Sequence, residues 1–109
     1  MLAVLFEVTV TTPHRQRYLD LAALLRPQLD TIPGFISIER FQSLTDSNRV
    51  LSLSWWESDH AISQWRQFEA HRMAQSEGKA QLFDGYRIHI CEVMRQHEFQ
   101  RSASSEPAS

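Results

Sequence analysis

Hydrophobic and polar residues alternate along the first ten positions of the chain. One face carries apolar side chains throughout, at Leu2, Val4, Phe6, Val8 and Val10. The other face mixes polar residues with small or apolar ones, at Ala3, Leu5, Glu7, Thr9 and Thr11. Such alternation, rich in β-branched residues, is typical of a strand that is buried on one side. The sequence therefore predicts a first strand over residues 2–11.

The next segment has the spacing of a helix. Apolar residues recur every three or four positions, at Tyr18, Leu21, Ala22, Leu25 and Leu29. Thr12 suits the N-cap, and Pro13 suits the first helical position, where no backbone N–H is needed. Pro27 removes one internal hydrogen bond, so we expect a kink or a weakened last turn. Residues 32–34, which are Ile-Pro-Gly, are expected to end the helix.

Two further strands are predicted on either side of a short polar loop. Residues 35–43 and 49–57 are rich in β-forming residues, and residues 44–48 have the composition of a turn. Two strands joined in this way form an antiparallel hairpin. In the strand predicted over residues 35–43, we expect Ile36 and Ile38 on one face and Phe35 and Phe41 on the other. In the strand predicted over residues 49–57, one face carries Leu51, Leu53 and Trp55.

A second helix and a last strand complete the predicted domain. Ser58 and Asp59 can cap the helix, which we expect to continue to about Ala80. The strand is expected from about Tyr86, with Ile88 and Ile90 facing inward. Residues 101–109 are small and polar, which predicts a disordered tail after one domain over residues 1–100.

The order of these elements is β-α-β-β-α-β, which defines an α+β, ferredoxin-like fold. Two helices would cover one face of a four-stranded antiparallel sheet. Depending on parity, the other face receives apolar residues such as Leu5, Phe35, Phe41, Trp56 and Val93. Because a large exposed apolar patch usually marks an interface, we expect this face to pack against a second copy in a homodimer.

Composition excludes several classes of protein. The 109 residues are 42% hydrophobic and 22% charged, with a net charge of −2 and no basic stripe, so nucleic-acid binding is not expected. No apolar run reaches the roughly 18 residues of a membrane span, and the N-terminus lacks the features of a signal peptide. The single cysteine, Cys91, favours a reduced, cytoplasmic setting. No cluster of His, Cys and Asp has the spacing of a metal site.

Two segments, "PGFISIERFQS" and "SLSWWESDHAISQWRQFEAHRMAQSEGKAQLFDGYRIHICEVMR", carry a resemblance to a known family. In order, they contain Pro-Gly-Phe, an aromatic at the end of the third strand, Trp, His, Ala-Gln and Tyr-Arg-Ile. This pattern resembles the antibiotic-biosynthesis monooxygenase (ABM) domain over roughly residues 2–97. The resemblance implies a dimeric α+β barrel in which two sheets pack face to face. It also implies an apolar substrate pocket between the helices and the sheet of each protomer.

Candidate chemistry gathers in residues 55–75, which hold the three tryptophans and two of the five histidines. His71 is the candidate general base, because the ordinary pKa of histidine lies near neutrality. On a continuous helix, six residues place Trp65 and His71 about 240° apart. A break between Phe68 and His71 would bring both to one cavity. The alternatives are that Trp65 is a core residue and that His71 is a surface or capping residue.

The resemblance implies a monooxygenase that oxidises a small aromatic or quinol-like substrate with O₂. The candidate pocket residues are Phe6, Trp65, Phe68, Phe83 and Tyr86. Cofactor-free oxygenation needs a base that ionises the substrate and a wall that excludes water. The chain has three glycines and no G-x-G-x-x-G signature, so no flavin or nicotinamide cofactor is predicted.

Two other functions remain open from the sequence. Haem-degrading relatives hold iron through a helix histidine, which would give His71 that role. Those relatives also carry an asparagine on the first strand, where this chain has Phe6 or Glu7, and a longer Trp-to-His spacing. The other alternative is a non-catalytic barrel that binds a small molecule, since fold alone does not imply function.

Overall fold

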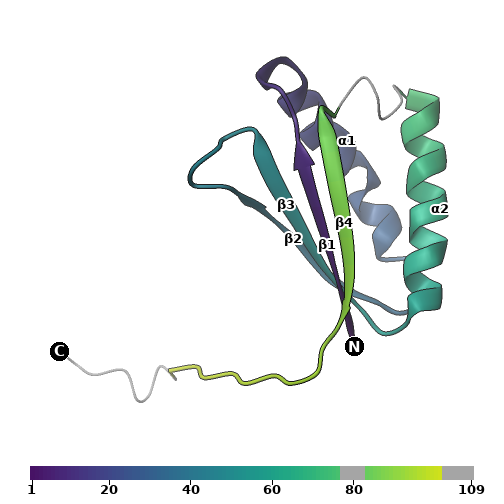
Figure 1. Cartoon of the computed structure of the whole chain (residues 1–109). Coiled ribbons are helices and arrows are strands. Elements are labelled where there is room, and N and C mark those ends of the chain that lie inside the picture. Colours follow the sequence, from purple (N-terminus) through teal and green to yellow (C-terminus); the bar gives the residue numbers. More distant parts are fainter. Residues whose placement is uncertain (77–82, 102–109) are drawn as a thin grey trace.

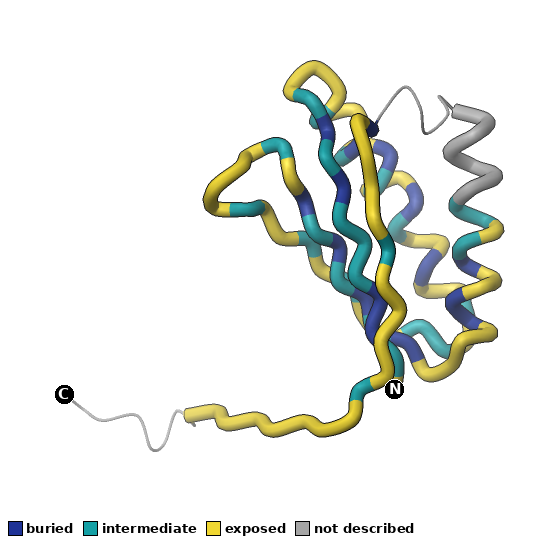
Figure 2. Tube along the Cα trace, viewed as in Figure 1, coloured by how far each residue is buried: buried dark blue, intermediate teal, exposed yellow. Residues whose placement is uncertain are grey.

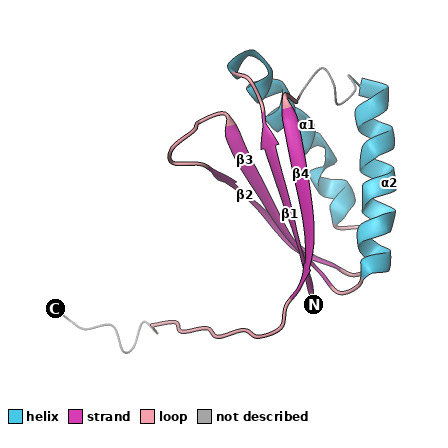
Figure 3. Ribbon diagram, viewed as in Figure 1, coloured by secondary structure: helices cyan, strands magenta, loops and turns pink. Residues whose placement is uncertain are grey.

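The helices and strands follow the predicted order. The computed structural model contains strands β1 (Leu2–Thr9), β2 (Phe35–Gln42), β3 (Arg49–Trp56) and β4 (Gly85–Glu92), with helices α1 (Thr12–Leu29) and α2 (Asp59–Ser76). It describes the backbone of residues 1–76 and 83–101 and the side chains of residues 1–69 and 83–101. The β-α-β-β-α-β order is confirmed (Figure 3). The predicted tail lies, from residue 102 on, outside the described residues.

The four strands form one antiparallel sheet in the order β2-β3-β1-β4. Strand β1, one of the two inner strands, pairs Phe6 with Ser52 of β3 on one side and with Ile88 of β4 on the other. Both helices lie on the same face of this sheet (Figure 1). The predicted ferredoxin-like α+β fold is thereby confirmed. No helix within the described residues is both long and apolar enough to cross a membrane.

The hydrophobic core fills the layer between the helices and the sheet (Figure 2). The sheet contributes Val4, Val8, Val50 and Trp56, and the helices contribute Leu21, Leu25, Leu29 and Ile62. The apolar face predicted for the first strand is thus the core face. Burying a side chain of this size stabilises the fold by about 1.5–3 kcal/mol, so this layer accounts for much of the stability.

A β-bulge in β2 corrects the predicted faces of this strand. The register with β3 shifts between Phe35 and Ser37, which reverses the alternation on the two sides of the shift. Phe35 therefore lies on the helix side, where its ring centroid is 5.1 Å from that of Trp56. Phe41 lies on the opposite face and is 44% exposed. The prediction that Phe35 and Phe41 share a face is wrong, because one extra residue changes the parity.

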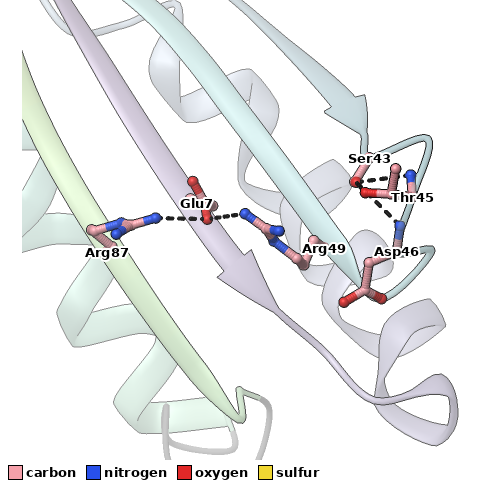
Figure 4. A network of polar contacts seen from close by, with 6 residues as sticks. All are labelled: Glu7, Ser43, Thr45, Asp46, Arg49 and Arg87. Carbon is pink, nitrogen blue, oxygen red and sulfur yellow. Dashed lines mark hydrogen bonds and ion pairs between the residues drawn. The ribbon is translucent and has the colours of Figure 1, made fainter.

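The face of the sheet away from the helices is called the open face here. Its apolar residues are Leu5, Phe41, Leu51, Leu53 and Trp55, which the register brings into neighbouring positions. Trp56 is not among them, since it is 1% exposed and packs in the core. On this face Glu7 accepts hydrogen bonds from Arg49 at 2.7 Å and from Arg87 at 3.1 Å (Figure 4). The open face therefore combines apolar residues with a three-residue ion-pair network.

The helix boundaries differ from the prediction at three points. Helix α1 has Thr11 as its N-cap, so the predicted cap at Thr12 lies one residue too late. The helix contains Pro27 and ends at Leu29, before the Ile-Pro-Gly residues 32–34 that were expected to end it. Helix α2 runs without interruption from Asp59 to Ser76, so it has no break between Phe68 and His71 of the kind that would bring Trp65 and His71 to one cavity. On β4, Ile88 packs against the core, while Ile90 on this edge strand is 47% exposed.

Gly34 fixes the approach of the second helix to the sheet. Its φ of +96° lies in the left-handed region, which favours glycine. A Cβ atom at this position would lie 2.9 Å from the Cβ of Ala61, in the first turn of α2. The carbonyl of Gly34 also accepts a 2.7 Å hydrogen bond from the backbone N–H of Glu57. This contact positions the start of α2 and therefore the side chains that α2 directs toward the sheet.

Candidate functional site

A cavity of about 50 Å³ lies between the two helices and the sheet. Its apolar wall includes Val4 and Phe6 from β1, Leu25 from α1, Ile62 and Trp65 from α2, and Phe83. The position follows from the fold, because β1 is an inner strand and both helices cross the same face. A pocket with mostly apolar walls and a few polar groups is typical of a small-molecule site.

Three of the predicted pocket residues line this cavity, namely Phe6, Trp65 and Phe83. The other two pack behind them. Phe68 lies 5.6 Å from Trp65 between ring centroids, and Tyr86 lies 5.7 Å from Phe6. Tyr86 is also 48% exposed, because it belongs to an edge strand. Phe6, Trp65 and Phe83 thus form part of the wall of the cavity, and the role of all five residues in binding stays a prediction.

Several polar side chains reach the same cavity from different elements. They are Tyr18 of α1, Arg40 of β2, Ser52 and Ser54 of β3, and Arg66 and Glu69 of α2. The alternation of β2 places Arg40 on the same side as Ile38, facing the helices. The alternation of β3 places Ser52 and Ser54 on the core side, between Val50 and Trp56. The cavity is therefore amphipathic, because its lining combines apolar side chains with the charged side chains of Arg40, Arg66 and Glu69.

Arg40 has unused hydrogen-bonding capacity. Its Nε atom is buried and has no hydrogen-bond partner among the described residues. The guanidinium group also interacts with the hydroxyl of Tyr18. A buried donor without an acceptor is unfavourable, because it has lost its hydrogen bonds to water without replacement. The cavity beside Arg40 is the place where a water or a ligand oxygen can supply that acceptor.

The hydroxyl of Tyr18 keeps its proton in this environment and is a hydrogen-bond donor. Burial raises the pKa of its hydroxyl above the ordinary value of 10.0, and the negative charge of Glu69 adds to this effect. The nearby Arg40 acts in the opposite direction without reversing the shift. Tyr18 is therefore neutral at physiological pH and can donate a hydrogen bond to an oxygen atom in the cavity.

The predicted base, His71, lies in α2, but its side chain is outside the described residues. Helical geometry still fixes the position of residue 71 around the helix axis. Ile62, Trp65, Arg66 and Glu69 form the stripe that lines the cavity. At about 100° per residue, position 71 lies roughly opposite the centre of this stripe on a regular helix. The continuous helix therefore does not bring positions 65 and 71 to one side.

The polar half of the site was not predicted from the sequence. Arg40 had a usable signal, since it shares its side of a strand with Ile38, and a charge at an inward position is unusual. Ser52 and Ser54 had no such signal, because their alternation with Leu51, Leu53 and Trp55 favours the opposite arrangement, with the apolar residues facing the core. Tyr18 was assigned to the apolar face of the first helix by its spacing. Its hydroxyl carries polar chemistry that a pattern of apolar positions does not record.

Comparison with known proteins places this fold and cavity in one class. The sheet topology and the two helices place the chain among ferredoxin-like α+β proteins. It is a member of the antibiotic biosynthesis monooxygenase family, whose model matches residues 1–77. Among the described residues, no group of three or more His, Cys, Asp or Glu side chains is arranged to hold a metal ion.

One protein is similar to the chain in sequence, and two solved structures are similar in fold. "Jasmonate monooxygenase ABM" of the fungus Pyricularia oryzae is 35% identical over 104 residues, or 93% of this chain and 48% of that protein. The chain thus spans about half the length of this relative. An antibiotic-biosynthesis-monooxygenase candidate from Nitrosomonas europaea has a TM-score of 0.72 at 14% identity, covering 87% of this chain and all of that chain. The heme-degrader MhuD of Mycobacterium tuberculosis has a TM-score of 0.69 at 16% identity, covering 90% and 100%.

Proposed function

We propose that the protein is a monooxygenase that oxidises a small aromatic or quinol-like molecule with O₂ in the cavity between its helices and its sheet. The observation that carries this proposal is the amphipathic cavity itself, in a chain of the monooxygenase family. Apolar walls suit a hydrophobic ring, and the polar groups suit an ionisable oxygen on that ring. A non-catalytic binding protein would share the cavity but would not consume O₂.

The proposed reaction converts a CH₂ group next to a phenol or enol into a carbonyl. One oxygen atom of O₂ enters the substrate and the other leaves as water. The substrate supplies all four electrons, so no external reductant is needed. Loss of the phenol or enol proton makes the substrate electron-rich enough to react with O₂. The protein would bind the substrate, accept this proton and keep water from the intermediate.

The size of the cavity sets a condition on this proposal. The volume of about 50 Å³ is smaller than the roughly 150 Å³ of an engineered cavity that holds benzene. A ring therefore enters only if side chains or a helix move. His71, the proposed base, requires a movement as well, because position 71 lies across α2 from the cavity. Bending of α2 after Glu69 on substrate binding would meet the second condition, and movement of the wall side chains would meet the first.

The test of the proposal is O₂ consumption with a defined set of substrates. The set contains an anthrone-type phenol, which carries such a CH₂ group, and jasmonate, which is suggested by the name of the fungal relative. A simple hydroquinone, which has no CH₂ group, is the negative control, since its oxidation to a quinone incorporates no oxygen. Mass spectrometry after reaction under ¹⁸O₂ should show one labelled oxygen in the product, with the second in water. Boiled protein and free metal chelator serve as controls. Absence of enzyme-dependent O₂ uptake with every substrate would favour the binding-protein alternative.

We propose that no haem takes part in the reaction. The residues that line the cavity do not fit this group, since a porphyrin is far larger than the cavity and no described lining residue is a histidine. Phe6 of β1 occupies the wall at the strand where haem-degrading relatives carry an asparagine. The similarity to MhuD supports a shared fold and no more, because the identity is 16%.

We also propose that the protein acts as a cytoplasmic homodimer that pairs through its open face. Support comes from the row of Leu5, Leu51, Leu53, Trp55 and Phe41 on that face, which the helices of the same chain leave uncovered (Figure 1). After β4, residues 93–101 run away from the body on the side opposite the helices (Figure 1). This segment exposes Met94 and Phe99, so it adds apolar area that a second copy can cover. The single free cysteine, Cys91, suits a reducing compartment.

A further inference from the structure

The charge of Arg40 requires an explanation that the fold alone does not supply. Charged side chains are mostly exposed and rarely face the core side of a sheet. Arg40 instead lies opposite Ser52 on β3 and lines the internal cavity. Its buried Nε has no hydrogen-bond partner among the described residues. The Nε–H of this guanidinium group can therefore donate a hydrogen bond to an acceptor atom of a molecule that enters the cavity.

We propose that the cavity recognises a small hydrophobic molecule through an anionic oxygen, a carboxylate or an ionised phenol, which accepts a hydrogen bond from Nε of Arg40. The proposal deepens the monooxygenase function and rests on it for the identity of the substrate, but binding itself requires no turnover. Arg40 then acts as the residue that determines specificity for charge.

The balance of charge in the cavity supports an anion. The charged side chains among its described lining residues are Arg40, Arg66 and Glu69, which sum to one positive charge. Charge-assisted hydrogen bonds are stronger than neutral ones, particularly where water is excluded. Tyr18, whose pKa is raised by burial, adds a neutral hydroxyl next to Arg40 that can donate to the same oxygen.

The apolar wall determines how the remainder of the ligand lies. Phe6, Phe83 and Tyr18 form edge-to-face ring contacts, with centroid distances of 5.9 Å for Phe6–Phe83 and 5.3 Å for Tyr18–Phe83. Trp65 lies on the α2 side of the same cavity. A ligand whose oxygen is held by Arg40 would therefore place its hydrocarbon part against these rings. This arrangement favours an amphiphilic ligand over a wholly apolar or wholly polar one.

Binding of ligands that cannot be oxidised tests the proposal directly. Calorimetry would compare benzoate with benzyl alcohol, which keeps the ring and loses the charge. Spectroscopy would follow the bound fraction of 4-nitrophenolate against 4-nitroanisole. We expect the wild-type protein to bind at least one anion roughly 10- to 100-fold more tightly than its neutral partner, the usual factor for a hydrogen bond to a charged group. Arg40→Met should abolish this preference and leave binding of the neutral ligands nearly unchanged.

Arg15→Met is a matched control. Arg15 also has a buried Nε without a hydrogen-bond partner among the described residues, but it does not line the cavity. We expect this variant to keep the preference of the wild-type protein. If Arg40→Met does not fold, Arg40→Lys replaces it and should show a weakened preference, since lysine keeps the charge and loses the planar fork.

The outcomes separate this inference from the proposed function. A preference for benzoate alone assigns the oxygen to a carboxylate, a preference for 4-nitrophenolate alone assigns it to a phenol, and both support the inference even if no O₂ is consumed. Equal binding of anions and neutral ligands, no binding at all, or an equal loss in Arg15→Met would overturn it. Enzyme-dependent oxygenation that does not change in Arg40→Met would leave the monooxygenase proposal standing and remove Arg40 from it.

Discussion

The indole Nε1–H of Trp56 donates a 2.8 Å hydrogen bond to the hydroxyl of Ser54, two positions earlier on the same strand. Both side chains are buried on the helix side of β3. Loss of the acceptor would leave a buried N–H without a partner, which costs about 1–3 kcal/mol. We therefore predict that Ser54→Ala lowers the free energy of unfolding by about this amount. Urea denaturation measures the change, with Ser63→Ala on the exposed side of α2 as the control. Equal losses in both variants would show that the hydrogen bond does not stabilise the core.

The ion pairs of Glu7 predict a dependence of stability on pH. The hydrogen bond from Arg49, followed by the contribution of Arg87, lowers the pKa of the Glu7 carboxyl below its ordinary value of 4.5. A carboxyl with a lowered pKa in the folded state stabilises the fold above the unfolded pKa, and this contribution is lost as pH falls through the folded pKa. The advantage of the wild-type protein over Glu7→Gln should therefore be full at neutral pH and decline below about pH 4.5.

Urea denaturation across this pH range measures the difference between the two proteins. The control is Glu39→Gln, at an exposed carboxylate on the same open face. Because Glu7 is accessible to solvent, salt should also reduce the difference at neutral pH. A difference that is constant from neutral to acidic pH would mean that the ion pairs contribute nothing.

The fold could be predicted from the sequence because alternation and helical spacing were strong in each element. Val8 and Val10, for example, lie on the predicted face and are fully buried. Single-residue shifts could not be predicted in the same way. The bulge near Phe35 depends on how β2 aligns with β3, which is a tertiary property and leaves no mark in the alternation of one strand.

The candidate site was predictable only in its aromatic half. Rings such as Phe6 and Phe83 are conspicuous in a sequence, and the partial burial of Phe6 and the full burial of Phe83 follow from hydrophobicity. The meeting of Arg40 with Tyr18 depends on which strand lies under which helix, and these residues are 22 positions apart in the chain. Their individual spacing therefore carried no information about their contact.

A charge in the middle of the open face tests the proposed dimer. Leu53 of β3 pairs with Leu5 of β1 and is flanked by Glu39 of β2 on this face. Leu53→Asp would place an additional carboxylate in the interface without a partner, which is strongly unfavourable. We predict that light scattering gives twice the chain mass for the wild-type protein and a monomer or aggregate for Leu53→Asp. Leu24→Asp, at a leucine of α1 that is 62% exposed, should remain dimeric. A monomeric wild-type protein at micromolar concentration would refute the proposal.

A haem titration tests the proposal that the chemistry needs no haem. The cavity is small and Phe6 forms part of its wall, so a porphyrin would have to displace core side chains. We predict no saturable shift of the Soret band at one haem per chain. A sharp shift that saturates at this ratio, and that disappears in His71→Ala but not in His60→Ala, would reverse the ranking of the two functions.

The proposed base is tested by substitutions on α2 once a substrate is known. General base catalysis contributes typically about 10²–10⁴-fold to a rate. His71→Ala should therefore lower kcat by a factor in this range, and His71→Gln should be nearly as slow, since glutamine keeps volume and hydrogen bonding but not basicity. Trp65→Phe should mainly raise KM, because it removes wall area from the cavity and no proton acceptor. His60→Ala is the control, since His60 is exposed in the first turn of the same helix.

The position of residue 71 makes the outcome of this experiment decisive. On the continuous helix it lies opposite the stripe of Ile62, Trp65 and Glu69, so the imidazole would act only if α2 bends when substrate binds. Hydrogen exchange of the backbone amides after Glu69 should then change on addition of substrate. Unchanged kcat in His71→Ala, together with unchanged exchange, would remove His71 from the mechanism. Ionisation of the substrate would then depend on stabilisation of its anion by Arg40, and kcat should fall in Arg40→Met while Arg15→Met remains active.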